Sequence, residues 1–427
     1  MDFATSTDPR VQAQLDRLAA LSLPQGRLGL ETIRALLARL GDPHNRLPPV
    51  FHVAGTNGKG STCAFLRAML EAGGKRVHMT TSPHLVRYNE RIRLAGKLIE
   101  DGPLAELLEE VLDAADGLNP SFFEVTIAAA FLAFSRTPAD ACVVEVGLGG
   151  RFDATNVLGP EVLAACGIAA LGIDHERFLL APEDGVPSDP FERIAFEKAG
   201  ILKRGVPFAT LEYRPAIEAV ISECAYKAEA KWFDAWHVEE RSGGFDFISE
   251  RGNHRGLPAP ALPGAHQMGN AALAIAMLQV AGFDPGEAAI REGLAKANWP
   301  ARLQRLSEGA LTGTREVWLD GGHNRSAGEA LARHFAGQRA HLVIGMIKGK
   351  DPKALLEPMQ ASLASVTAVP VPTHDCHSAA AFGVGAIAAQ DVPTALAALP
   401  DDGLPVLIAG SLYLAGEVLR LNGEVAD

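Results

Sequence analysis

Apolar and polar positions along the chain alternate in blocks that predict strands followed by helices. Val50 to Ala54 is a short apolar run that predicts a buried strand, a glycine-rich turn follows at 55–60, and Ser61 to Ala72 has the spacing of a helix. Ala141 to Val146 is apolar almost throughout, as in a central strand of a parallel sheet. Strand, glycine turn and helix in this order open an α/β unit.

The rest of the pattern predicts further elements on both sides of this unit. Helix-like spacing covers residues 11–40, a surface loop rich in Pro, Asp and Gly covers 179–190, strands or hairpins fit 231–260, and a long helix fits about 267–280. After Trp299-Pro300 a second series begins, with strands at 317–319, 341–345, 366–371 and 404–409 and helices at 326–335 and 353–363. We therefore expect an α/β protein of two domains, residues 1–298 and 299–427.

Composition narrows the class of protein. The chain has 427 residues, 48% of them hydrophobic, and a formal net charge of −12, which argues against nucleic-acid binding. The five cysteines form no CxxC pair, so we expect a reducing cytoplasm and neither a disulfide framework nor a zinc ribbon. The first residues lack the apolar core of a signal peptide, and no run of 18 apolar residues occurs, so we expect no membrane partner.

The strongest single feature is the segment Val53 to Thr62, VAGTNGKGST. Glycines let backbone amides surround a phosphate at a helix N-terminus, and Lys59 supplies a cation for the β and γ phosphates. The strict P-loop spacing is not met, because Val53 stands in place of its first glycine and Gly60 separates Lys59 from Ser61. A glycine turn without a ligand is the alternative. The predicted phosphate-binding residues are Thr56, Asn57, Gly58, Lys59, Gly60, Ser61 and Thr62.

Two further segments carry charged residues in positions suited to ligands. The loop TSPHLVRYNERI, residues 81–92, offers His84, Arg87 and Arg91 to an anion, although solvated charges would give the same composition. Glu145 ends an apolar strand, where an ionised acid is costly unless it has a partner. Mg²⁺ is one such partner, and a buried base is the other. The run His374 to His377 has no second cluster at a zinc-like spacing, so we interpret it as a loop.

The glycine loop resembles that of the Mur-type ligases, which join a carboxylate to an amine at the expense of ATP. Most of the chain is similar to one branch of that superfamily, the dihydrofolate synthase/folylpolyglutamate synthase family. The similar segments are residues 81–92, FFE at 122–124, EVGLGGRFDATN at 145–156, DH at 174–175, EKAGI at 197–201, LPGAHQMGN at 262–270, PARLQ at 300–304, DGGHN at 320–324 and GSLY at 410–413.

The resemblance implies a fold and an activity. Residues 1–298 would form an ATP- and folate-binding domain with a mostly parallel sheet of the P-loop type, and residues 299–427 a smaller Rossmann-like α/β domain that binds glutamate. The activity would be an ADP-forming ligase that joins L-glutamate to dihydropteroate, to the γ-carboxylate of folates, or to both, through an acyl phosphate. The implied cofactors are ATP and Mg²⁺, with two ions and a carbamylated Lys198, and the implied state is a monomer.

The resemblance also assigns roles to residues. Lys59, Lys198 and His323 would act in catalysis, and Asn270, Arg302 and Asp320 would join the phosphate loop in binding ATP. Ser61 and Glu145 would hold the first metal ion, and His175 and carbamylated Lys198 the second. The implied substrate contacts are Ser82, Pro83, His84, Arg87, Phe123, Arg151, Asp153, His323 and Ser411.

This chain departs from the family pattern after His175, where a short L-G-x-T stretch is replaced by the longer residues 176–185, and at Gly322, where alanine is usual. Two alternatives stay open. One is a Mur ligase acting on a peptidoglycan precursor, although few residues precede the phosphate loop and residues 81–92 point to folate. The other is a nucleotide-binding module without catalytic activity, in which Glu145, His175 and Lys198 would have no function.

Overall fold

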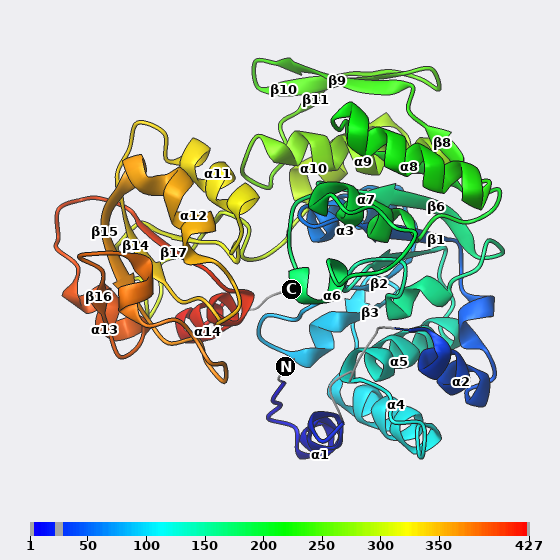
Figure 1. Ribbon diagram of the computed structural model, residues 1–427, viewed down its shortest axis with the longest axis horizontal. Coiled ribbons are helices and arrows are strands. Elements are labelled where there is room, and N and C mark those ends of the chain that lie inside the picture. Colours follow the sequence, from blue (N-terminus) through cyan, green and yellow to red (C-terminus); the bar gives the residue numbers. More distant parts are fainter. Residues whose placement is uncertain (1–3, 22–28, 425–427) are drawn as a thin grey trace.

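The computed structural model describes residues 4–21 and 29–424, and it contains two large sheets that lie side by side (Figure 1). The first sheet has eight strands in the order β4-β3-β2-β5-β1-β6-β7-β8. Six of them run parallel, and β3 and β4 form an antiparallel edge. The strands are β1 (Val50–Ala54), β2 (Val77–Thr80), β3 (Ile92–Leu94), β4 (Lys97–Leu98), β5 (Ala141–Glu145), β6 (Leu163–Ile168), β7 (Pro207–Thr210) and β8 (Lys231–Phe233).

Helices cover both faces of this sheet, and each face has its own apolar core. One face packs against α1 (Pro9–Ala19), α2 (Glu31–Arg39), α4 (Asp101–Ala114), α5 (Phe122–Arg136), α7 (Pro190–Ala199) and α8 (Pro215–Ala228). The other packs against α3 (Lys59–Ala72), α9 (His266–Val280) and α10 (Glu287–Lys296). Burial on both faces explains why β1 and β5 are apolar from end to end.

A small antiparallel sheet lies beyond α9 (Figure 1). It consists of β9 (Trp236–Arg241), β10 (Gly244–Ser249) and β11 (His254–Pro258), which confirms the strands expected in residues 231–260. Phe245 and Phe247 of β10 are fully buried and join the core under α9.

The second large sheet has six strands in the order β12-β13-β17-β14-β15-β16, parallel except for β12. Its strands are β12 (Gln304–Arg305), β13 (Val317–Leu319), β14 (Ala340–Ile344), β15 (Leu363–Ala368), β16 (Ile387–Ala388) and β17 (Val406–Ala409). Its helices are α11 (Arg325–His334), α12 (Pro352–Met359), α13 (Val392–Ala398) and α14 (Leu412–Asn422). A mostly parallel ATPase-type sheet followed by a smaller α/β sheet confirms the predicted fold class.

Several local expectations need correction. Residues 11–40 contain two separate helices, α1 and α2, and residues 22–28 of that run lie outside the described part. The helix expected at 353–363 ends at Met359, because Leu363 pairs with Ala340 and opens β15. The domain division at 298/299 stays a prediction. The last strand of the small antiparallel sheet ends at Pro258, and the first strand of the six-stranded sheet begins at Gln304. No helix in the described residues is long and apolar enough to cross a membrane.

Candidate active site

The phosphate loop joins β1 to α3, as the sequence predicted. Gly55 and Gly58 have φ of 152° and 79°, which residues with a side chain rarely adopt, and the helix begins at Lys59. The hydroxyl of Thr56 ties the loop to the segment after β6 by donating to the Gly172 carbonyl at 2.7 Å and accepting from the Gly172 amide at 3.0 Å. The loop therefore presents a helix N-terminus and Lys59 at the carboxyl edge of the sheet.

Close packing explains two glycines of this loop. A Cβ on Gly58 would lie 2.4 Å from Oδ1 of Asn270, and one on Gly60 would lie 2.5 Å from the Trp299 ring. Asn270 on α9 is buried and donates to Gln267 at 3.0 Å. The predicted nucleotide residue Asn270 is therefore in direct contact with the phosphate loop.

Glu145 ends β5 next to this loop, and its side chain is almost fully buried. Burial raises the pKa of Glu145, although the charge of Lys59 and a 3.2 Å hydrogen bond from the Ser82 amide oppose the rise. Ser61 is buried nearby in the first turn of α3, and the buried hydroxyl of Thr62 has no hydrogen-bond partner within the protein. The buried carboxylate of Glu145 and the buried hydroxyls in the first turn of α3 are oxygen donors of the kind that a divalent cation prefers.

Glu145 also lines a pocket between the two large sheets. The pocket brings the predicted substrate residues Ser82 and Pro83 together with the predicted nucleotide residue Arg302. Ser82 was predicted only as a substrate contact, and its backbone amide also donates to the Glu145 carboxylate at 3.2 Å. The remaining lining residues are Arg67, Met79, Thr81, Leu85, Glu90, Arg93, Leu98, Asn298, Trp299, Pro300 and Leu412.

The loop at 81–92 is folded around Glu90. The Glu90 carboxylate accepts hydrogen bonds from the amides of Leu85, Val86 and Arg87 at 2.6–2.9 Å. Arg91 is fully buried and donates to Nδ1 of His84 at 2.9 Å. Arg87 lies at the surface, where it pairs with Asp101 at 3.0 Å. Internal bonds thus hold Arg91, and the loop residues that line the pocket are Thr81, Ser82, Pro83, Leu85 and Glu90.

Lys198 lies near the end of α7, and its side chain is buried against the turn after β5. Its ammonium nitrogen is 3.3 Å from the Gly149 carbonyl. Burial, with a contribution from the Lys59 charge, lowers the pKa of Lys198 to about 7. A substantial fraction of this amine is therefore unprotonated near neutral pH.

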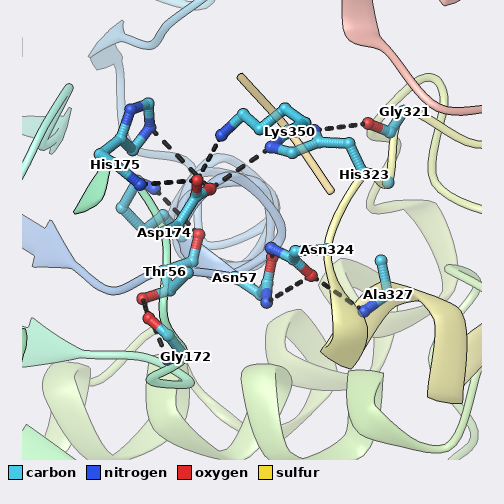
Figure 2. A network of polar contacts seen from close by, with 12 residues as sticks. Thr56, Asn57, Gly172, Asp174, His175, Gly321, His323, Asn324, Ala327 and Lys350 are labelled. Carbon is cyan, nitrogen blue, oxygen red and sulfur yellow. Dashed lines mark hydrogen bonds and ion pairs between the residues drawn. The ribbon is translucent and has the colours of Figure 1, made fainter. Parts of the chain in front are cut away.

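Asp174 connects loops of the two large sheets (Figure 2). Its carboxylate lies 3.3 Å from Nε2 of His323 and also pairs with Lys350, both of which belong to the six-stranded sheet's loops. Burial would raise the pKa of Asp174, but the hydrogen bond with His323 and the nearby charges lower it well below its ordinary value. His175 follows with φ of 52°, and its side chain is 43% exposed. Partial desolvation by the surrounding protein lowers its pKa to about 4, so its ring is neutral and able to bind metal.

A second contact also joins loops of the two large sheets, and we call this region the junction. The side-chain amides of Asn57 and Asn324 exchange hydrogen bonds, 3.1 Å in one direction and 3.4 Å in the other (Figure 2). Oδ1 of Asn324 also caps α11 by accepting from the Ala327 amide at 3.0 Å. Asn324 and Lys350 were not among the predicted site residues. Asn324 could have been predicted, because it belongs to the DGGHN motif. Lys350 could not, because its loop comes close to Asp174 only in the folded chain.

The other predicted residues of the second sheet lie at its strand ends. Asp320 follows β13 and accepts from the amides of Leu303 and Gly322 at 2.8 and 2.7 Å, which fixes the turn that carries Arg302. Ser411 follows β17, is buried, and caps α14 by accepting from the Tyr413 amide at 3.2 Å.

Three predicted substrate residues have partners inside the protein. Asp153 is buried and accepts from the amides of Leu148 and Thr155 at 2.7 and 3.0 Å. Arg151 forms ion pairs with glutamates at 2.6 and 2.8 Å. Phe123 packs its ring against Gly147, where a Cβ would lie 2.3 Å away. Their substrate roles stay predictions.

Within the described residues, no group of three or more His, Cys, Asp and Glu side chains is arranged to hold a metal ion. Residues 373–377 lie outside the helices and strands, which confirms the loop predicted there.

Known proteins are similar to this chain in sequence and in fold, although no family model matches the chain. The dihydrofolate synthase/folylpolyglutamate synthase of Bacillus subtilis is 36% identical over 355 residues, which cover 78% of each protein. The structure of Escherichia coli FolC in complex with DHPP and ADP has a TM-score of 0.85, with 29% identity over 98% of this chain and 99% of that one. A bifunctional folylpolyglutamate synthase/dihydrofolate synthase with Mn, AMPPNP and L-glutamate bound has a TM-score of 0.84, with the same identity and coverage. The chain therefore belongs to the dihydrofolate synthase/folylpolyglutamate synthase family of ATP-dependent glutamate ligases.

Proposed function

We propose that this enzyme catalyses two related reactions, the addition of L-glutamate to dihydropteroate and its addition to the γ-carboxylate of folates. One observation carries the proposal. A single pocket joins the predicted acceptor residues Ser82 and Pro83 to Glu145 and Arg302, and its wall includes Trp299, whose ring packs against Gly60 of the phosphate loop. An acceptor carboxylate in this pocket would lie next to the phosphates that Lys59 holds.

The chemistry follows from the weakness of a carboxylate as an electrophile. An acceptor oxygen attacks the γ phosphorus of ATP, a new P–O bond forms, and ADP leaves. The glutamate amine then attacks the carbonyl carbon of the acyl phosphate, inorganic phosphate leaves with its bonding electrons, and the amine loses a proton. Lys59 and Arg302 offset negative charge on the phosphates, and the sheet-to-sheet contacts of Asp174 and Asn57 keep water away from the acyl phosphate.

ATP and a divalent metal ion are the cofactors, and Ser61 and Glu145 are the residues that would hold the first ion. His175 and Lys198 would hold a second ion once Lys198 carries a carbamate, which turns a cation into an oxygen ligand. The buried Lys198 amine with a pKa of about 7 supports this step, because only a neutral amine reacts with CO₂. Bound ions supply charge neutralisation to the phosphoryl group.

The remaining residues divide between the two substrates and ATP. Asn270, Asp320 and Arg302 contact ATP, and His323 and Ser411 position the incoming glutamate with its amine toward the acyl phosphate. The acceptor side comprises Ser82, Pro83, His84, Arg87, Phe123, Arg151 and Asp153. The substrates are small molecules, and the enzyme acts as a monomer.

The test is ADP release with Mg²⁺-ATP and L-glutamate, comparing 7,8-dihydropteroate with tetrahydrofolate as acceptor. Release with both, and only when glutamate is present, is the expected result. Release with one acceptor alone would restrict the activity to that substrate. Release with neither, by folded protein that binds ATP, would overturn the assignment.

A further inference from the structure

A cluster of four charged side chains, two of them buried and two partly buried, lies next to Lys198 and includes a residue from the unusual segment after His175. The carboxylate of Glu183 receives two bonds from the Arg151 guanidinium, at 2.6 and 3.0 Å. Arg193 of α7 donates to the same carboxylate at 2.8 Å. Glu197, also of α7, pairs with Arg151 at 2.8 Å and with Arg193 at 3.0 Å.

The cluster is a closed network of two cations and two anions. The exposed fractions of the Arg193 and Glu197 side chains are 6% and 5%, and those of Arg151 and Glu183 are 21% and 18%. Bidentate pairing of a guanidinium with a carboxylate fixes direction as well as distance. The pairs in this network therefore hold the loop of Glu183, the turn of Arg151 and helix α7 in one arrangement.

Backbone contacts transmit this arrangement to Lys198. The Arg151 amide donates to the Glu197 carbonyl at 2.8 Å. A Cβ on Gly150 would lie 2.7 Å from that carbonyl and 3.0 Å from Cα of Lys198, so the last turn of α7 touches the 149–151 turn directly. Glu197 and Lys198 are neighbours on the helix, and a helix whose Glu197 side is held cannot rotate its Lys198 side away from Gly149.

We propose that Glu183 is a positioning residue for Lys198, acting through Arg151, Arg193 and Glu197. The longer segment after His175 thus contributes a carboxylate that orients a metal ligand of the site. In this account Arg151 orients the Lys198 turn in addition to the acceptor contact proposed for it above. The inference rests on the proposed function in one respect, the role of Lys198 in holding the second ion.

The variant Glu183→Gln keeps the size of the side chain and removes the charge that both arginines share. Its matched control is Glu110→Gln, because Glu110 receives two bonds from Arg136 at 2.6 and 2.7 Å on the surface of α4 and α5. Lys198→Met serves as the reference for loss of the ligand itself, and Glu183→Asp restores a carboxylate. Thermal unfolding of each variant separates misfolding from misplacement.

The decisive readout is Mn²⁺ binding to the ADP complex, followed by electron paramagnetic resonance, together with kcat and the KM for ATP. We expect Glu183→Gln to weaken the second Mn²⁺ site roughly tenfold to hundredfold, the usual cost of losing a group that orients a metal ligand. We expect the kcat of Glu183→Gln to fall together with its Mn²⁺ affinity, while its KM for ATP stays near that of the natural chain. Glu183→Asp should recover part of the loss. Glu110→Gln should change neither Mn²⁺ binding nor kcat.

Two other results have distinct meanings. If Lys198→Met weakens the second Mn²⁺ site and Glu183→Gln leaves it intact, the positioning role is overturned and the proposed function stands. If Lys198→Met leaves Mn²⁺ binding unchanged, the second-ion role of Lys198 is overturned, and the positioning proposal falls with it. A loss of Mn²⁺ binding by Glu183→Gln that only parallels its loss of folded protein would likewise overturn the positioning role.

Discussion

Asp174 and His323 lie 3.3 Å apart although 149 positions separate them in the chain, and they hold loops of the two large sheets together. Lys350 pairs with the same carboxylate, so one buried anion faces two cationic or polar groups of the other sheet (Figure 2). This contact joins the side of the site that carries the phosphate loop to the side predicted to hold glutamate.

Replacing Asp174 by Asn should therefore impair catalysis more than nucleotide binding. The change removes the anion that His323 and Lys350 share, and a shift of reacting groups by about 1 Å can cost roughly a hundredfold in rate. We expect kcat/KM for glutamate to fall roughly tenfold to hundredfold while ADP affinity, measured by titration, stays nearly unchanged.

The control is Asp375→Asn on a neighbouring loop. Asp375 pairs with Lys348 at 3.0 Å, but the side chains are 77% and 60% exposed, so the pair should contribute little. Equal losses in the two variants would contradict a specific role for Asp174.

Glu145→Gln should separate activity from stability. Burial raises the folded-state pKa of Glu145 above its unfolded value, so ionising this carboxyl weakens the fold as pH rises from the unfolded value through the folded one. Neutral pH lies above the unfolded value, so without metal this cost is present there, and glutamine avoids it. We expect an unfolding midpoint equal to or above that of the natural chain, with ADP release lower by roughly a hundredfold or more. A clearly lower midpoint would show that the carboxylate stabilises the metal-free fold.

Activity should depend on dissolved CO₂ through Lys198. Its pKa of about 7 means that the amine is mostly free above pH 7 and mostly protonated below it, so carbamate formation should decline as pH falls through 7. Enzyme prepared without CO₂ should lose activity and regain it on addition of bicarbonate at pH 8. Lys198→Ala should be inactive, insensitive to bicarbonate, and partly rescued by a short carboxylic acid. Full activity after thorough CO₂ removal would contradict the carbamate.

Asn324→Ser tests the amide pair across the junction. Serine still caps α11, but it is too short to exchange bonds with Asn57. We expect kcat to fall severalfold, on the order of the 1 kcal/mol that one hydrogen bond contributes, with little change in thermal stability. Asp391→Ser alters a cap of the same kind on α13 and should leave kcat unchanged. A similar loss in both variants would assign the effect to capping alone.

The sequence predicted the parts of the site that are local in the chain. The phosphate loop, the acid at the end of β5 and helix α9 depend on short-range patterns, and all three lie where they were expected. Pairings between distant segments could not be predicted. Lys350 pairs with Asp174 although 176 positions separate them in the chain. Glu183 stands in a segment whose polar composition predicted only a surface loop exposed to solvent. Strand pairing likewise ended α12 early, because Leu363 gains a partner in β14 that periodicity does not reveal.

The most direct test of the central claim follows oxygen from the acceptor to phosphate. The acceptor is 7,8-dihydropteroate whose carboxylate carries oxygen-18, incubated with enzyme, Mg²⁺-ATP and L-glutamate, and the released phosphate is analysed by mass spectrometry. Activation as an acyl phosphate predicts one labelled oxygen in each phosphate formed, in step with ADP and with the amide product. Product formation with unlabelled phosphate would contradict this mechanism.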